Sequence, residues 1–264
     1  MRKGDIGDAV RVLQHRLNQA GIPVEEDCFY SEATEAAVKA FQRRVGLVED
    51  GVAGPKTLAL LQTGAPDSRF LSHADLERAA QRLDAPVAAV CAVNEIESRG
   101  HGFLPDGRPV ILFERHVMYE RLNKHGLNAE EMAKRYPAVV NTARGSYAGG
   151  AAESMRMAAA AGIDKTSALE SASWGLFQIM GYHWELLGYA SAEAFATAMR
   201  ENEAQQLDAF VRFVEADPAL HKALKSRKWA EFARIYNGPA YKENLYDVKL
   251  ARAYDRHAVE SERV

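Results

Sequence analysis

One glutamate stands where its surroundings are expected to keep it protonated. Four residues of the segment 86–100 recur at the spacing of one helix face: Val90, Val93, Asn94 and Glu97. The face is otherwise apolar, so we expect it to be buried. Burial and the negative end of the helix both disfavour an ionised carboxylate, so both raise the pKa of Glu97. A carboxyl group that keeps its proton near neutral pH can act as a general acid.

An ion pair is the competing interpretation of Glu97. Arg99 or Arg108 could neutralise a glutamate at a helix end, and spacing alone favours this simpler role. Glu95 lies about 200° from Glu97 around the helix axis, and we expect it to face solvent.

Two later segments carry polar groups that could line a cleft. The stretch 173–181 is apolar but contains glycines and a single amide, Gln178. The stretch 235–239 ends a predicted helix with Tyr236 and Asn237. Each has a plain structural explanation, a buried turn for the first and a helix stop for the second.

Glu114 is the best candidate for a second carboxylate. It follows the predicted strand 109–113, where a side chain can lie at a cleft edge. A salt bridge to Arg108 or Arg115 is the alternative. Asp106 is a reserve candidate, but we expect it to serve the turn at 105–107.

The sequence offers no signal for other chemistries. It contains no HExxH, no CxxC, no GxSxG and no P-loop, and three histidines lack metal-ligand spacing: His101, His116 and His183. We therefore expect no metal and no cofactor. The chain has 33 Lys and Arg against 36 Asp and Glu, so no basic excess indicates nucleic-acid binding.

The first 64 residues predict a small three-helix unit. Two apolar stripes have helical spacing, Val10–Leu13–Leu17 and Val38–Phe41–Val45, and the central residue of each is followed by a glutamine, Gln14 and Gln42. A third short helix starts near residue 57. The net charge of residues 1–64 is −1, from eight Lys and Arg against nine Asp and Glu.

The rest of the chain predicts a second, mainly α domain with a minor β element. Residues 65–71 indicate a linker, and residues 72–264 form the second domain. Ser72 and Asp75 predict a capping box for a helix ending near residue 83, and Asp84 is expected to cap the next helix. Further helices are expected at 151–161, 204–214 and 229–236. Cys28 and Cys91 are expected to be free thiols.

Residues 4–62 resemble the small three-helix peptidoglycan-binding modules. The resemblance rests on a V-x-x-L-Q opening, a T-x-x-A-V-x-x-F-Q middle and a G-L-x-x-D-G-x-x-G-x-x-T ending. The family often has Asp-Gly-x-Phe-Gly before its second helix. This chain has Asp-Cys-Phe-Tyr-Ser at residues 27–31.

The second domain resembles the lysozyme-like superfamily. In order, it contains Glu-Ser, Gly-Leu-Phe-Gln-Ile-Met and Tyr-Asn-Gly, as goose-type lysozymes and soluble lytic transglycosylases do. More closely, residues 75–260 resemble the N-acetylmuramidase domain of modular phage endolysins, through ESRGHGFLPDGRPVILFERHVMYERL and SASWGLFQIMGYHW. The order of the two domains is similar to that in endolysins of phages infecting Gram-negative bacteria.

This resemblance implies an activity and a set of site residues. The enzyme would hydrolyse the β-1,4 bond between N-acetylmuramic acid and N-acetylglucosamine, with Glu97 as the acid and Glu114 stabilising the transition state or activating water. Four residues would bind the sugars: Ser98, Gln178, Tyr236 and Asn237. The alternatives are a lytic transglycosylase that forms 1,6-anhydro products and a non-catalytic wall-binding protein.

The resemblance also implies a place of action. The N-terminus has no apolar signal segment, and the longest apolar run, residues 85–93, is too short to span a membrane. We expect a monomer without stable membrane insertion, made in the host cytoplasm and acting on periplasmic peptidoglycan. A holin-type partner would then provide passage across the inner membrane.

Overall fold

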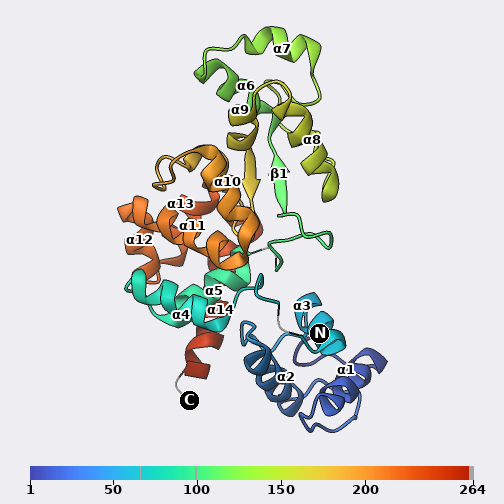
Figure 1. Cartoon of the computed structure of the whole chain (residues 1–264). Helices are drawn as coiled ribbons and strands as arrows, with labels where there is room; N and C mark the ends of the chain where they lie inside the picture. Colours follow the sequence, from blue (N-terminus) through green and yellow to red (C-terminus); the bar gives the residue numbers. More distant parts are fainter. Residues whose placement is uncertain (66, 99, 262–264) are drawn as a thin grey trace. The chain divides into compact units, whose positions relative to one another are not determined.

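The chain folds into two compact units. The computed structural model describes residues 1–65, 67–98 and 100–261, which divide into Met1–Arg78, the N-terminal unit, and Ala79–Val264, the C-terminal unit (Figure 1). The finer division predicted from the sequence, with residues 1–64 and 72–264 joined by a linker at 65–71, stays a prediction.

Three helices build the core of the N-terminal unit, as predicted: α1 (Asp8–Gln19), α2 (Glu32–Val45) and α3 (Pro55–Thr63). Both predicted apolar stripes are buried in one cluster, together with Tyr30, Leu47 and Leu60. The Ser31 side chain caps α2, and Gly46 ends it in the left-handed conformation.

Gln14 and Gln42 are the polar centres of an internal repeat. The Gln14 amide donates to Asp27 Oδ1 and to Thr34 Oγ1, at 2.7 and 3.0 Å. The Gln42 amide donates to Asp50 Oδ1 and to Thr57 Oγ1, at 2.7 and 3.2 Å. Each buried amide therefore ties its helix to the following turn and to the next helix.

The repeat explains the backbone at Cys28. The Cys28 N–H donates to Gln14 Oε1, and the Gly51 N–H donates to Gln42 Oε1. Both residues are left-handed, with φ of 64° at Cys28 and 65° at Gly51. Glycine adopts this conformation freely, whereas a residue with a Cβ is strained. Cys28 therefore holds a position that favours glycine.

The C-terminal unit is mainly helical, with one small sheet (Figure 1). The strands β1 (Ile111–Phe113), β2 (Ala172–Trp174) and β3 (Ile179–Met180) are antiparallel in the order β1-β2-β3. Ile111 pairs with Trp174, which in turn pairs with Ile179. The predicted fold class, a three-helix unit followed by an α domain with a minor β element, is confirmed.

The remaining elements of the chain, in order, are α4 (His73–Arg82), which crosses the boundary of the two units, then α5 (Val87–Glu97), α6 (Arg115–Lys124), α7 (Ala129–Arg135), α8 (Ala151–Ala161), α9 (Lys165–Glu170), the 3-10 helix η1 (Gly181–His183), α10 (Ala192–Glu201), α11 (Glu203–Ala216), α12 (Pro218–Lys225), α13 (Trp229–Asn237), the 3-10 helix η2 (Pro239–Asn244) and α14 (Tyr246–Ser261). Among the described residues, no helix is long and apolar enough to cross a membrane.

The capping predictions were half right. The Ser72 hydroxyl and backbone N–H both donate to Asp75, which completes the predicted capping box of α4. Asp84 does not cap α5, however, because Pro86 takes that position without a side-chain cap bond. Asp84 instead adopts a φ of 45° and pairs with Lys225 of α12.

Glu95 is exposed, as predicted, but it also makes contacts that the sequence did not predict. Its carboxylate pairs with Arg256 and, at 3.0 Å, with His257 Nε2, both on α14. The sequence window around Glu95 could not reveal this, because α14 lies some 160 residues later and packs along α5. The helix that carries Glu97 is thus held by the last helix of the chain.

Candidate active site

Four of the predicted site residues meet at one cavity of the C-terminal unit. The cavity has a volume of about 520 Å³. Glu97 comes from the end of α5, Gln178 from the turn before β3, and Tyr236 and Asn237 from the end of α13. Seven further residues line it: Phe177, Ile179, Met180, Tyr182, His183, Phe213 and Tyr246.

Glu97 is the carboxyl group of this cavity. Val90 and Val93 on the same face of α5 are buried, as the spacing predicted. Burial raises the pKa of Glu97 to about 6, although a hydrogen bond from Asn237 Nδ2 to Glu97 Oε1, at 2.9 Å, acts in the opposite direction. The pKa is therefore raised as expected, with burial as the cause.

Glu97 forms no ion pair with any of the residues that the structure describes. Arg108 pairs with Asp106 of its own turn, at 2.6 Å, and Arg99 lies outside the described residues. Asp106 thus serves its turn, as expected. Within the described part of the chain, Glu97 has no cationic partner. Its proton is governed by burial and by one amide.

Tyr236 and Asn237 link the end of α13 to the rest of the cavity. The Tyr236 hydroxyl donates to the Phe177 carbonyl at 2.9 Å, and its ring stacks on Phe232 with centroids 5.7 Å apart. Burial, with Glu97 nearby, raises the pKa of Tyr236 far above its usual range, so the phenol keeps its proton. Gly238 ends the helix with a φ of 80°.

Gln178 shapes the turn that forms another wall. Its backbone has a φ of 51°, an uncommon conformation for a residue with a side chain. The Ser173 hydroxyl donates to Gln178 Oε1 at 2.9 Å, and Gln178 Nε2 donates to the Gly175 carbonyl at 2.8 Å. Both ends of the amide therefore fix the turn while the residue lines the cavity.

A buried polar pair that was not predicted from the sequence anchors two segments of this site. Gln206 of α11 accepts from the Leu176 N–H at 2.9 Å and donates to the Gly102 carbonyl at 3.3 Å. Glu203, one turn earlier, accepts from the Gly102 N–H at 2.8 Å. The pair thus joins the segment after Glu97 to the turn that carries Gln178.

Two glycines make room for this pair. A Cβ on Gly102 would lie 2.0 Å from Gln206 Oε1, and one on Gly175 would lie 2.4 Å from Gln206 Cδ. Glu203 and Gln206 are almost fully buried. The available sequence signal was this polar pair, at i and i+3 on the face of α11 that also carries Leu207 and Phe210.

Glu114 and Ser98 are not among the residues that line the cavity. The Tyr147 hydroxyl lies 2.9 and 3.0 Å from the two Glu114 oxygens, and His116 lies 3.3 Å away. Arg115 donates to backbone carbonyls instead of pairing with Glu114. The Ser98 hydroxyl accepts from the Gly100 N–H at 3.3 Å. Their predicted roles stay predictions.

The cavity therefore combines one protonatable carboxyl, two side-chain amides and several aromatic rings. These groups suit acid-assisted cleavage of a bond in a polar, ring-shaped substrate. In the described part of the chain, no group of three acidic, histidine or cysteine side chains could hold a metal ion. Within the described residues, neither Cys28 nor Cys91 forms a disulfide, as expected.

Residues 86–258, about two thirds of the chain, match the N-acetylmuramidase family. The chain belongs to this family. Residues 6–61 match the family described as "Putative peptidoglycan binding domain". The order of the two matches confirms the predicted modular architecture, and the muramidase match confirms the predicted enzyme class, a glycoside hydrolase of the lysozyme type.

A solved structure is similar over nearly the whole length of this N-acetylmuramidase. The crystal structure of the endolysin of Burkholderia phage AP3 has 56% sequence identity and a TM-score of 0.93, covering 99% of this chain and 98% of that chain. N-acetylmuramoyl-L-alanine amidase CwlL of Bacillus licheniformis is 41% identical over 77 residues, which is 28% of this chain. The match spans only 21% of the amidase, so the two proteins share one segment and are not similar over their whole lengths.

Proposed function

We propose that this N-acetylmuramidase is an endolysin that hydrolyses the β-1,4 bond between N-acetylmuramic acid and N-acetylglucosamine in peptidoglycan. The observation that carries the proposal is Glu97, whose pKa is raised to about 6 in a cavity lined by amides and aromatic rings. Family membership and the similar phage endolysin support the same substrate.

Glu97 is the general acid of the proposed reaction. Its proton passes to the glycosidic oxygen while the bond to C1 of N-acetylmuramic acid breaks and an oxocarbenium-like state develops. The carboxylate that forms keeps the hydrogen bond from Asn237 Nδ2, which stabilises its charge. A water molecule then bonds to C1 and releases one proton, which restores the acid when Glu97 receives it.

The water needs a base, and two carboxylates are candidates. Ionised Glu97 lies in the cavity after the first proton transfer and can take the proton back. Glu114 is the base or charge stabiliser that the sequence predicts. The two routes differ in whether Glu114 is needed, which a single substitution tests. Ser98, Gln178, Tyr236 and Asn237 are the proposed sugar-binding residues.

The N-terminal unit holds the enzyme on its insoluble substrate in this proposal. Tethering raises the local concentration of scissile bonds at the cavity. The match of residues 6–61 to peptidoglycan-binding domains supports this role. Synthesis in the host cytoplasm, action on periplasmic peptidoglycan, passage through a holin-type partner and a monomeric state are further parts of the proposal.

Product analysis tests the reaction. Purified murein is digested with the enzyme, and the released fragments are analysed by mass spectrometry. Hydrolysis leaves reducing N-acetylmuramic acid ends. A lytic transglycosylase would leave 1,6-anhydro ends, because the muramic acid 6-hydroxyl would replace water. Unchanged turbidity and no fragments would indicate a non-catalytic wall-binding protein.

A further inference from the structure

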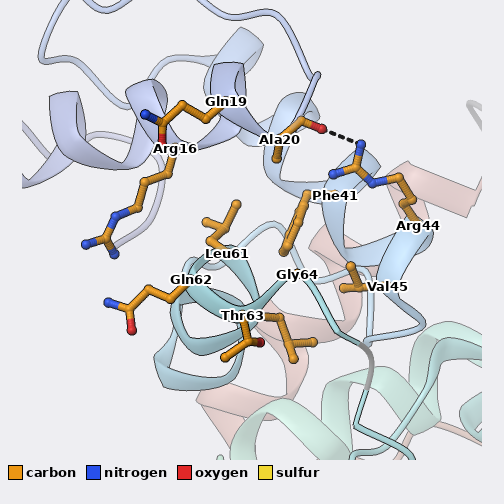
Figure 2. Close-up of a pocket in the computed structure, with 11 residues that line it drawn as sticks. Arg16, Gln19, Ala20, Phe41, Arg44, Val45, Leu61, Gln62, Thr63 and Gly64 are labelled. Carbon is orange, nitrogen blue, oxygen red and sulfur yellow. Dashed lines mark hydrogen bonds between the residues drawn. The ribbon is translucent and has the colours of Figure 1, made fainter.

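Besides the cavity of the C-terminal unit, the protein has a cavity of about 510 Å³ in its N-terminal unit. The proposed reaction does not use this cavity. Parts of all three helices line it (Figure 2). Arg16 comes from α1, Arg44 lies near the end of α2, and Leu61 and Gln62 lie near the end of α3. Its position within a peptidoglycan-binding unit makes it a candidate ligand site.

Two guanidinium groups give this cavity a local positive charge. Among the described residues, the Arg16 guanidinium group has no hydrogen-bond or ion-pair partner, although the Arg16 carbonyl accepts from the Ala20 N–H. Arg44 uses one nitrogen to donate to the Ala20 carbonyl, at 2.5 Å, which leaves further N–H groups for a ligand (Figure 2). None of the residues that line the cavity is acidic. Residues 1–64 have a net charge of −1, so the positive charge at this cavity is local and the unit as a whole is not basic.

The other lining groups suit a short peptide. Gln19 and Gln62 offer side-chain amides, and Leu61 and Val45 offer aliphatic surface. Guanidinium groups bind carboxylates through paired hydrogen bonds of matching geometry. An acidic peptide with small aliphatic side chains combines both requirements.

The cavity is poorly suited to sugar rings. Phe41 is the only aromatic residue among those that line it, and its side chain is 2% exposed, with the Arg44 guanidinium 5.4 Å from the ring centroid. No open ring face is therefore available for stacking. The cavity of the C-terminal unit, by contrast, is lined by five aromatic residues: Phe177, Tyr182, Phe213, Tyr236 and Tyr246.

We propose that the cavity between α1, α2 and α3 binds the carboxylate-bearing stem peptide of peptidoglycan through Arg16 and Arg44. This inference rests on the proposed function, because it takes peptidoglycan as the ligand of the N-terminal unit. It assigns the peptide to the N-terminal unit and leaves the glycan to the C-terminal unit.

The experiment uses the full chain with Glu97→Gln, so that sacculi are not digested during the measurement. Co-sedimentation with sacculi is measured against three soluble competitors: the stem tetrapeptide with free carboxylates, the same peptide with its carboxylates amidated, and inorganic phosphate. We expect the free peptide to displace the protein at a concentration at least about tenfold lower than either control, since each charged hydrogen bond lost weakens binding by about tenfold or more.

Four variants locate the contact in the same background. Arg16→Gln with Arg44→Gln should weaken the affinity for the free tetrapeptide by about tenfold or more, measured by calorimetry. Arg44→Gln and Arg43→Gln form a matched pair, since Arg43 is the neighbouring residue, pairs with Glu49 and does not line the cavity. Arg43→Gln should change the affinity by less than about twofold. Arg44→Lys keeps the charge but loses the paired N–H groups of the guanidinium. Its affinity for the tetrapeptide should therefore lie between those of Arg44→Gln and Arg43→Gln.

Two kinds of failure remain distinguishable. Equal displacement by the amidated peptide or by phosphate, or unchanged peptide affinity in the double variant, would overturn the stem-peptide assignment while sacculus binding and Glu97 chemistry stand. A full chain that stays in the supernatant with sacculi would overturn both this inference and the retention role. Product analysis would still test the cleavage reaction separately.

Discussion

The two cavities have nearly the same volume, about 520 and 510 Å³, and opposite chemistry. In the C-terminal unit, a carboxyl group is partly withdrawn from water, and burial raises its pKa to about 6. In the N-terminal unit, the Arg44 side chain remains exposed, so it keeps its charge at little cost. In the roles proposed for the two cavities, burial keeps a proton on Glu97 until reaction, and exposure lets Arg44 attract a charged ligand.

Removing the buried proton donor should have the largest effect. Glu97→Gln keeps the shape of the side chain but cannot donate the proton, so murein turbidity clearance should slow by at least about 100-fold. Near wild-type clearance would contradict the assignment.

Stability provides the control for this variant. The pKa of Glu97 rises from an ordinary 4.5 to about 6 on folding, so the folded state holds this proton more tightly than the unfolded state. The contribution of Glu97 to the free energy of unfolding is therefore largest below about pH 4.5 and falls between about pH 4.5 and 6. Above that window it is lower by about 2 kcal/mol. Glu97→Gln avoids this cost, so the variant should unfold at a higher temperature than the wild type at about pH 8. A lower unfolding temperature would show that the variant loses activity because its fold is destabilised.

The pH dependence should reveal the same group. Only protonated Glu97 can donate, so kcat/KM should fall on the alkaline side with an apparent pKa of about 6, tending to about tenfold per pH unit. The profile should be measured on soluble glycan fragments, so that sacculus binding does not contribute. An alkaline limb centred above about pH 8 would mean that another group controls the rate.

Gly102→Ala, which crowds the buried pair Glu203 and Gln206, should have an intermediate effect. A methyl group on Gly102 would collide with Gln206 Oε1 and shift the segment that follows Glu97. We expect about a tenfold loss of kcat, because small displacements of catalytic groups are costly. Gly54→Ala is the control, since nothing lies within 4 Å of its Cβ position and its φ is −82°. Equal activity of the two variants would remove the positioning role of Gln206.

Glu114 tests whether the cavity works with one carboxylate. Glu114 is held by Tyr147 and does not line the cavity, so we expect Glu114→Gln to retain activity within about threefold. Tyr147→Phe, which removes the same hydrogen bonds from the other side, should behave alike. A loss of about 100-fold in Glu114→Gln alone would instead establish the second catalytic carboxylate that the sequence predicts.

The smallest effect concerns the internal repeat of the N-terminal unit. Cys28→Gly should relieve a left-handed backbone and stabilise that unit by about 1 kcal/mol, whereas Gly51→Ala should destabilise it by a similar amount. Differential scanning calorimetry of the full chain would follow both. Two shifts of the same sign would contradict the equivalence of the two positions.

Local patterns in the sequence were enough for much of the fold and site. The apolar stripes predicted α1 and α2, and the stripe of α5 predicted burial of Glu97 together with its raised pKa. The strand before Glu114 and the capping box of α4 were also local signals. Each depends on residues within one or two helical turns, where spacing and side-chain chemistry dictate the outcome.

Contacts between segments that are far apart in the sequence could not be predicted from these local patterns. Glu95 pairs with Arg256 and His257, and Asp84 pairs with Lys225, across separations of more than 140 residues. Gln206 joins Gly102 to Leu176 in the same non-local way. Spacing cannot show which of many charged or amide side chains will meet, because that depends on the packing of whole helices.

The packing of α14 against α5 has a consequence for the order of events during synthesis. The helix that carries Glu97 leaves the ribosome long before Arg256 and His257, the partners of Glu95, have been made. Contacts of such large sequence separation form late, after the intervening chain has been ordered. A nascent or prematurely terminated chain without α14 would lack this support for α5, so we expect muralytic activity to appear only after α14 has been made.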